Sequence, residues 1–108
     1  MYSYTRAESR ERRRLFLKGA HQAFGDNLDS RVTARMHEID AVAAERGARE
    51  LAALERQMET ARDTVATAKA TLRAAKWGTE RSAAKDAVRE AEKNLRRAER
   101  AYHRAANS

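Results

Sequence analysis

Apolar side chains in the second half of the chain recur at alternating spacings of three and four residues. This spacing places them along one stripe of an α-helix and is typical of a coiled-coil seam. The first stripe consists of Leu51, Leu54, Met58, Ala61, Val65, Ala68, Leu72 and Ala75. The second stripe consists of Ala84, Val88, Ala91, Leu95, Ala98, Tyr102 and Ala105. If one helix ran through both stripes, the first would continue at Thr79, Ser82 and Asp86, so these polar residues indicate a break between them.

The break falls at Trp77-Gly78-Thr79-Glu80, which predicts the tip of a helical hairpin. Gly78 suits the left-handed conformation that follows a helix end, Thr79 is a candidate N-cap for the next helix, and Glu80 is favourable in its first turn. With the turn centred on Gly78, the stripes face each other in layers, and every layer but one sets a large side chain against an alanine. Such alternation fills an antiparallel seam without voids. We therefore predict an all-α fold whose C-terminal half is an antiparallel, Ala-rich coiled-coil hairpin.

The two flanks of this seam differ in character. On one flank, Arg62 and Lys69 are expected near Glu92 and Glu99, which favours the proposed register. The other flank is uncharged and consists of Gln57, Thr64, Thr71, Ala87, Asn94 and Ala101. Because nothing long or charged obstructs this second flank, we expect another helix to pack against it.

The N-terminal half begins with a capping box, Thr5-Arg6-Ala7-Glu8, and Gly25 followed by Asp26-Asn27 is a helix stop signal. These signals predict a helix over residues 6–24 that folds back on the rest of the chain. Its apolar residues are Leu15, Phe16, Leu17, Ala20 and Phe24.

A second helix is expected to start at Asp29 or Ser30. Its apolar positions Val32, Met36, Ile39 and Ala43 have helical spacing but do not join the stripe that begins at Leu51. The apolar face must therefore rotate, kink or turn near Gly47. Because no good N-cap follows Gly47, a continuous or gently kinked helix over about residues 30–77 is favoured, followed by a third helix over 79–106. The chain is thus expected to be one helical domain over residues 1–108.

The chain has 108 residues, and a domain of this size with one narrow seam buries little apolar surface. Packing more helices together would remedy this, either in a closed three-helix bundle or in a homo-oligomer whose hairpins form a four-helix cross-section. A homo-oligomer is expected, with a dimer favoured.

Candidate catalytic and metal-binding residues are few. The chain has no cysteine, and His21, His37 and His103 do not have the spacing of zinc ligands. No glycine-rich phosphate loop is present, and the carboxylates fall mainly on predicted solvent faces. We therefore expect no catalytic residues, no metal and no cofactor. No apolar run approaches the roughly 20 residues that span a bilayer, and MYSYTRAESRERRR has no signal-peptide core, so a cytoplasmic protein without a membrane partner is expected.

The net charge of +7 is unevenly distributed. Residues 1–25 and 60–108 are net basic, whereas residues 26–59 are net acidic. One basic tract lies in the first predicted helix and comprises Arg10, Arg12, Arg13, Arg14 and Lys18. The other follows the outer face of the last helix and comprises Arg89, Lys93, Arg96, Arg97, Arg100 and Arg104. In the proposed register the second tract lies beside Glu50, Glu55 and Glu59, so part of its charge is expected to be compensated.

These observations predict a non-enzymatic, self-associating interaction module that docks through its basic surfaces on a polyanion, with nucleic acid the favoured polyanion. The alternative is a protein-only adaptor or assembly scaffold whose basic helices bind an acidic protein partner. Salt-sensitive retention on DNA or RNA distinguishes the two.

Overall fold

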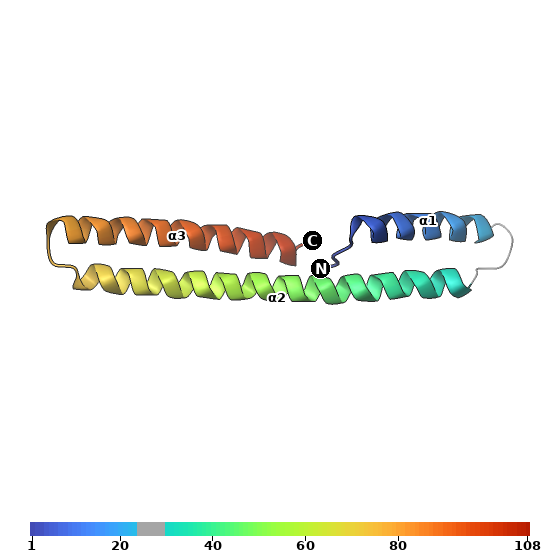
Figure 1. The fold of residues 1–108 in the computed structure, drawn as a ribbon, viewed down its shortest axis with the longest axis horizontal. Coiled ribbons are helices and arrows are strands. Elements are labelled where there is room, and N and C mark those ends of the chain that lie inside the picture. The colour runs from blue at the N-terminus through green and yellow to red at the C-terminus, as the bar shows by residue number, and fades with distance from the viewer. Residues whose placement is uncertain (24–29) are drawn as a thin grey trace. The chain divides into compact units, whose positions relative to one another are not determined.

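The computed structural model describes the backbone of residues 1–23 and 30–108 and the side chains of residues 1–19 and 30–108. These residues form helices α1 (Arg6–Ala23), α2 (Ser30–Ala74) and α3 (Gly78–Ala106) (Figure 1). The predicted all-α fold is confirmed. The helix stop expected at Gly25-Asp26-Asn27 and the start expected at Asp29 lie outside the described residues.

The second half of α2 and α3 pack as the predicted antiparallel hairpin (Figure 1). The members of the two stripes are buried or half-buried, and the best buried of them are Met58, Val65, Ala75, Ala84, Ala91 and Ala105. On the charged flank, Lys69 Nζ lies 3.7 Å from Glu92 Oε1, as the register requires. Arg62 donates instead to the sulfur of Met58 at 3.6 Å, and no ion pair joins Arg62 to Glu99 in the described part of the chain.

The connection between α2 and α3 is short. The amide of Ala75 donates to the carbonyl oxygens of Thr71 and Leu72, at 3.0 and 3.2 Å, and ends α2. Gly78 has the left-handed φ of 64° that was expected of it. The predicted capping role of Thr79 is wrong: α3 begins at Gly78, so Thr79 already lies within the first turn, and the N-cap position is held by Trp77 in extended conformation without a side-chain hydrogen bond.

Helix α2 runs without interruption through Gly47, as favoured from the sequence. Contacts nevertheless group the chain into two units, Met1–Arg49 and Glu50–Ser108, so α2 contributes to both. Within the first unit, α1 packs on α2 around the buried side chains of Val32, Ile39 and Ala43. The expectation of a single domain over residues 1–108 stays a prediction.

Candidate functional site

The segment that precedes α1 lies along α2 in the first unit. The amide of Ser3 donates to the carbonyl oxygen of Ala43 at 3.0 Å. A Cβ atom on Gly47 would lie 2.0 Å from the carbonyl oxygen of Met1, so only glycine admits the backbone this closely. The rings of Tyr2 and Tyr4 stack with their centroids 6.1 Å apart and an interplanar angle of 8°. Two aromatic rings are thereby held beside the start of α1.

Helix α1 starts with the predicted capping box. The amide of Glu8 donates to Thr5 Oγ1 at 3.1 Å, and the amide of Thr5 donates to Glu8 Oε1 at 3.0 Å. These reciprocal bonds satisfy two of the amide groups that a helix start leaves without a partner. They also fix the direction in which the first turn of α1 projects its side chains.

Asp40 on α2 accepts hydrogen bonds from two side chains of the N-terminal region. Arg12 Nε and the Tyr4 hydroxyl each donate to Asp40 Oδ1 at 2.7 Å, and Arg12 Nη2 lies 3.4 Å from Oδ2. The Arg12 guanidinium also lies 5.5 Å from the centroid of the Tyr4 ring, within cation–π range. Hydrogen bonds from Arg12 and then Tyr4 lower the pKa of Asp40, whereas the bond to Asp40 raises the pKa of Tyr4.

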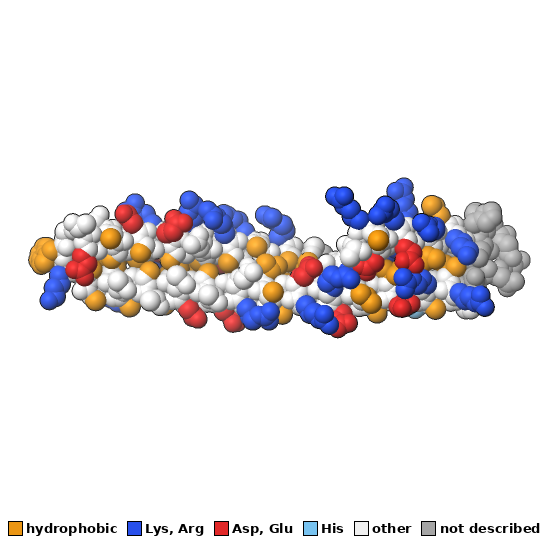
Figure 2. Space-filling view, in the orientation of Figure 1, with side chains coloured by type: hydrophobic (Ala, Val, Ile, Leu, Met, Phe, Trp, Pro, Cys, Tyr) orange, Lys and Arg blue, Asp and Glu red, His pale blue; other side chains and the backbone are white. Residues whose placement is uncertain are grey.

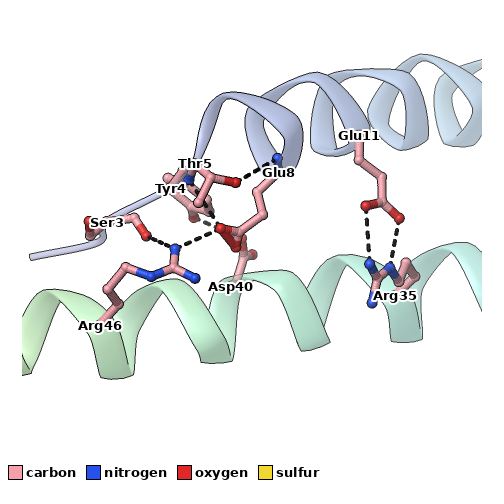
Figure 3. A network of polar contacts seen from close by, with 8 residues as sticks. All are labelled: Ser3, Tyr4, Thr5, Glu8, Glu11, Arg35, Asp40 and Arg46. Atoms are coloured by element: carbon pink, nitrogen blue, oxygen red, sulfur yellow. Dashed lines mark hydrogen bonds and ion pairs between the residues drawn. The ribbon is translucent and has the colours of Figure 1, made fainter.

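Two acidic side chains of α1, Glu8 and Glu11, are paired with arginines of α2 (Figure 3). Arg46 Nη1 donates to Glu8 Oε1 at 2.6 Å and to the carbonyl oxygen of Ser3 at 2.7 Å. Arg35 binds Glu11 with two hydrogen bonds of 2.7 and 3.1 Å. The hydrogen bonds from Arg46 and Arg35 are the main reason that the pKa values of Glu8 and Glu11 are lowered.

The basic side chains on the outer side of α1 have no such partner. Arg13, Arg14 and Lys18 are exposed and form no ion pair with any described residue. Arg10 is also exposed, and its Nε lies 3.4 Å from the carbonyl oxygen of Arg6. Figure 2 shows Lys and Arg side chains gathered along this side of α1. Because Glu8, Glu11 and Asp40 are each paired with an arginine, this face is net positive, although Glu11 also lines a hollow with Arg10 and Arg14.

Arg12 differs from the rest of its predicted tract. It is half-buried and binds Asp40, whereas its neighbours on α1 face solvent. An arginine held in this way contributes to the local positive potential but is not free to rearrange around a ligand. We therefore take Arg10, Arg13, Arg14 and Lys18 as the accessible part of the α1 tract.

Shallow grooves flank Tyr4 on this face. One has a volume of about 400 Å³ and is lined by Tyr4, Ser9, Arg12, Arg13 and Phe16. Another has a volume of about 460 Å³ and is lined by Tyr4, Arg6, Ser9 and Arg10. Phe16 and Leu17 are 63% and 61% exposed, so the apolar residues of α1 do not all face α2. Tyr2, Tyr4 and Arg6 were not predicted from the sequence as site residues; the two tyrosines just before the capping box were the available signal.

The basic tract of α3 is also exposed. All six of its members face solvent: Arg89, Lys93, Arg96, Arg97, Arg100 and Arg104. Arg89 pairs with Asp86 of the same helix at 3.3 Å. No ion pair of the described residues joins the last four arginines of the tract to Glu55 or Glu59, and their compensation by the acidic residues of α2 stays a prediction. A hollow on this face includes the acidic residues Asp86 and Glu90 beside its basic ones, so its charge is mixed, unlike that of the two grooves beside Tyr4.

Metal sites, membrane spans and resemblance to known proteins are further features that can identify a function. No group of three or more His, Cys, Asp or Glu side chains is placed to hold a metal ion among residues 1–19 and 30–108. None of the described helices combines the length and apolar character needed to cross a membrane. Comparison with protein-family models, with curated proteins and with solved structures finds no match for this chain.

Proposed function

We propose that the protein is a non-enzymatic helical interaction module that self-associates and binds nucleic acid through its basic surfaces. The observation that carries this proposal is the outer face of α1. Its arginines project away from α2, while the acidic residues nearby are each bound to another arginine. The face therefore offers an uncompensated positive charge to a polyanion.

Arginine is well suited to this partner. Its planar guanidinium binds a phosphate with two parallel hydrogen bonds, and its charge persists at every physiological pH. Arg13 and Arg14 each lie about one helical turn, or about 5.4 Å along the axis, from Arg10, so the tract can meet successive phosphates of a strand. Neutralising phosphates releases condensed counterions, which supplies sequence-independent affinity.

Self-association is supported by the flank of the hairpin that the sequence analysis singled out. Gln57, Thr64, Thr71, Ala87 and Asn94 are exposed, and the hydroxyls of both threonines bond to carbonyl oxygens of their own helix. A groove of about 540 Å³ runs beside them, lined by Ala53, Arg56, Gln57, Thr60, Ala61, Asn94 and Ala98. A helix from another copy would cover Thr64 and Thr71 without burying an unsatisfied hydroxyl.

The test is retention on unrelated DNA and RNA sequences at low salt, where screening is weakest. Arg13→Gln/Arg14→Gln should weaken retention by a similar factor on every sequence, because phosphate contacts carry no base information. Arg73→Gln/Lys76→Gln removes the same charge from exposed positions outside both tracts and should have a smaller effect. If the wild-type protein is not retained at low salt, the nucleic-acid proposal is wrong and the adaptor for an acidic protein replaces it.

A further inference from the structure

The α1 face combines exposed aromatic rings with uncompensated arginines. We propose that Tyr2, Tyr4 and Phe16 form a stacking platform for unpaired bases, so that this face binds single-stranded nucleic acid in preference to duplex. This inference rests on the proposed function and specifies the kind of nucleic acid that the α1 face selects.

The rings of Tyr2 and Phe16 are accessible. Tyr2 is 62% exposed and Phe16 is 63% exposed, whereas Tyr4 is half-buried. Phe16, Tyr4 and Arg13 line the same groove. A ring exposed beside a guanidinium is the combination that single-strand-binding surfaces use, because bases stack on the ring while the cation meets the backbone phosphates.

The platform is also held in place before any ligand binds. The Tyr4 hydroxyl is fixed by Asp40 at 2.7 Å, and Tyr2 stacks on the Tyr4 ring. The backbone between them is fixed by the bond from Ser3 to Ala43. A preorganised aromatic pair loses little conformational entropy when a base stacks on it, which favours binding.

The charge around the platform identifies the occupant as an anion. The side chains that line the two grooves are Tyr, Ser, Phe and Arg, and none is acidic. The nearby carboxylates of Glu8, Glu11 and Asp40 are bound to Arg46, Arg35 and Arg12. A second copy of this face would bring like charges together and would be repelled. A polyanion that carries flat aromatic groups can pair with the positive charge of the arginines and stack on the exposed rings.

The preference for a single strand follows from base geometry. In a duplex the bases are stacked on one another, and only their edges are presented in the grooves. The faces of unpaired bases are free, so only a single strand can use the rings of Tyr2 and Phe16. Stacking does not depend on base identity, so little sequence preference is expected.

The experiment compares binding of the full chain to fluorescein-labelled 30-mers: oligo(dT), oligo(U) and a mixed-sequence duplex, at equal salt. We expect tighter binding to the two single strands than to the duplex. Tyr2→Leu and Phe16→Leu should each weaken single-strand binding by about 5-fold to 150-fold, the range that corresponds to loss of one stacked base, and should leave duplex binding unchanged. The DNA and RNA arms distinguish which single strand is preferred.

Three control variants make the result specific. Phe16→Tyr retains a ring and should retain single-strand affinity. Trp77→Leu removes an exposed aromatic ring, 85% exposed, that lies outside the α1 face and should have no effect. In that Trp77→Leu background, Phe16→Trp provides a single tryptophan whose fluorescence should be quenched by oligo(dT) and not by the duplex.

The outcomes separate this inference from the proposed function. If the wild-type chain binds no nucleic acid at low salt, both are wrong. If it binds duplex as tightly as single strands, or if the leucine variants bind like wild type, the function stands and the stacking platform is wrong. The platform is also wrong if Phe16→Leu lowers the sedimentation mass, because the ring then belongs to an interface between copies.

Discussion

Asp40 is the acceptor at which the N-terminal segment, α1 and α2 meet. The Tyr4 hydroxyl and Arg12 Nε both lie 2.7 Å from the same carboxylate oxygen. Only the ionised carboxylate accepts both bonds at full strength, which is why these donors lower the pKa of Asp40. Arg46 and Arg35 lower the pKa values of Glu8 and Glu11 in the same way. The packing of α1 on α2 is therefore linked to pH.

The direction of this linkage follows from the lowered pKa values. Because each carboxyl is more acidic in the folded chain than in the unfolded one, its contribution to stability is present above the unfolded values, about 3.9 to 4.3. It is lost as the pH falls through the lower folded values. We expect the protection factors of α1 amides in hydrogen exchange to fall on acidification below pH about 4. Asp40→Asn should reduce this dependence, and protection that stays constant to lower pH would contradict the account.

Gly47 lies within α2, where glycine costs about 1 kcal/mol relative to alanine. The structure supplies a reason for it, because a Cβ atom there would lie 2.0 Å from the Met1 carbonyl oxygen. The close approach lets Ser3 bond to Ala43 and places the tyrosines beside α1. One missing side chain on α2 thus helps to position the aromatic residues of the α1 face.

Gly47→Ala should displace residues 1–3 from α2 while the helix itself stays intact. The expected result is loss of hydrogen-exchange protection at the Ser3 amide, with α2 amides unchanged. Gly19→Ala is the matched control: its Cβ would make an ordinary contact of 3.9 Å with Val32 Cγ1, and it should be neutral or stabilise α1 by up to about 1 kcal/mol. Unchanged protection of Ser3 in Gly47→Ala would contradict this role for Gly47.

At the scale of elements, the hairpin is held by a seam of alanines facing larger side chains. Ala84, Ala91 and Ala105 of α3 are all buried, and α3 has no larger buried residue. Small residues let the backbones of α2 and α3 approach closely, and the larger residues of α2, Met58 and Val65, fill the space between them. The seam therefore tolerates little added volume.

Ala91→Leu tests this packing. Extra methylene groups in a filled seam force the helices apart, and we expect a loss of about 1 to 3 kcal/mol in the free energy of unfolding. Ala83→Leu makes the same change at an exposed position of α3 and should change that free energy by less than about 0.5 kcal/mol. Urea unfolding followed by circular dichroism gives both values. Equal effects of the two substitutions would show that the seam is not where the stripes place it.

The elements that local patterns specify were predicted well. The stripes located the hairpin and its Lys69–Glu92 pair, and Thr5 with Glu8 located the start of α1. These features depend on residues that repeat along one helix or lie within one turn. The cap of α3 was assigned to Thr79 because threonine is a common cap, but the backbone enters the helix one residue earlier, at Gly78.

The contacts of the candidate site could not be predicted from patterns within a single helix. The bond from Tyr4 to Asp40 joins residues 36 positions apart, and that from Arg12 to Asp40 joins residues 28 positions apart. Such pairs depend on how α1 is rotated against α2, which no periodicity in a single helix records. For that reason the sequence grouped Arg12 with its exposed neighbours, and the tyrosines were not recognised as part of the site.

For the whole molecule, the net charge of +7 and the narrow apolar seam both point to partners. None of the described residues larger than alanine is completely buried, and Trp77, Phe16 and Leu17 are largely exposed. A helical chain with so small a core gains stability by packing its remaining faces against another molecule. Self-association and nucleic-acid binding would each cover a different face.

We expect sedimentation velocity to show a dimer or a higher oligomer at micromolar concentration. Ala87→Glu adds a charge to the uncharged flank of the hairpin and should reduce the mass, because a helix packed there would bury an unpaired carboxylate. Ala70→Glu adds the same charge to an exposed position on the side of α2 opposite the seam and should not. A monomer whose mass does not change with concentration would contradict self-association.

The central claim is that the arginines of the α1 face bind phosphates, and the salt dependence of binding tests it most directly. For a duplex, the slope of log K against log salt concentration changes by about 0.9 for each phosphate contact. Arg13→Gln/Arg14→Gln should reduce the wild-type slope by about 1 to 2 on this basis, whereas Arg73→Gln/Lys76→Gln should leave it unchanged. An affinity that does not vary with salt, or a slope that is the same in Arg13→Gln/Arg14→Gln as in wild type, would contradict the claim.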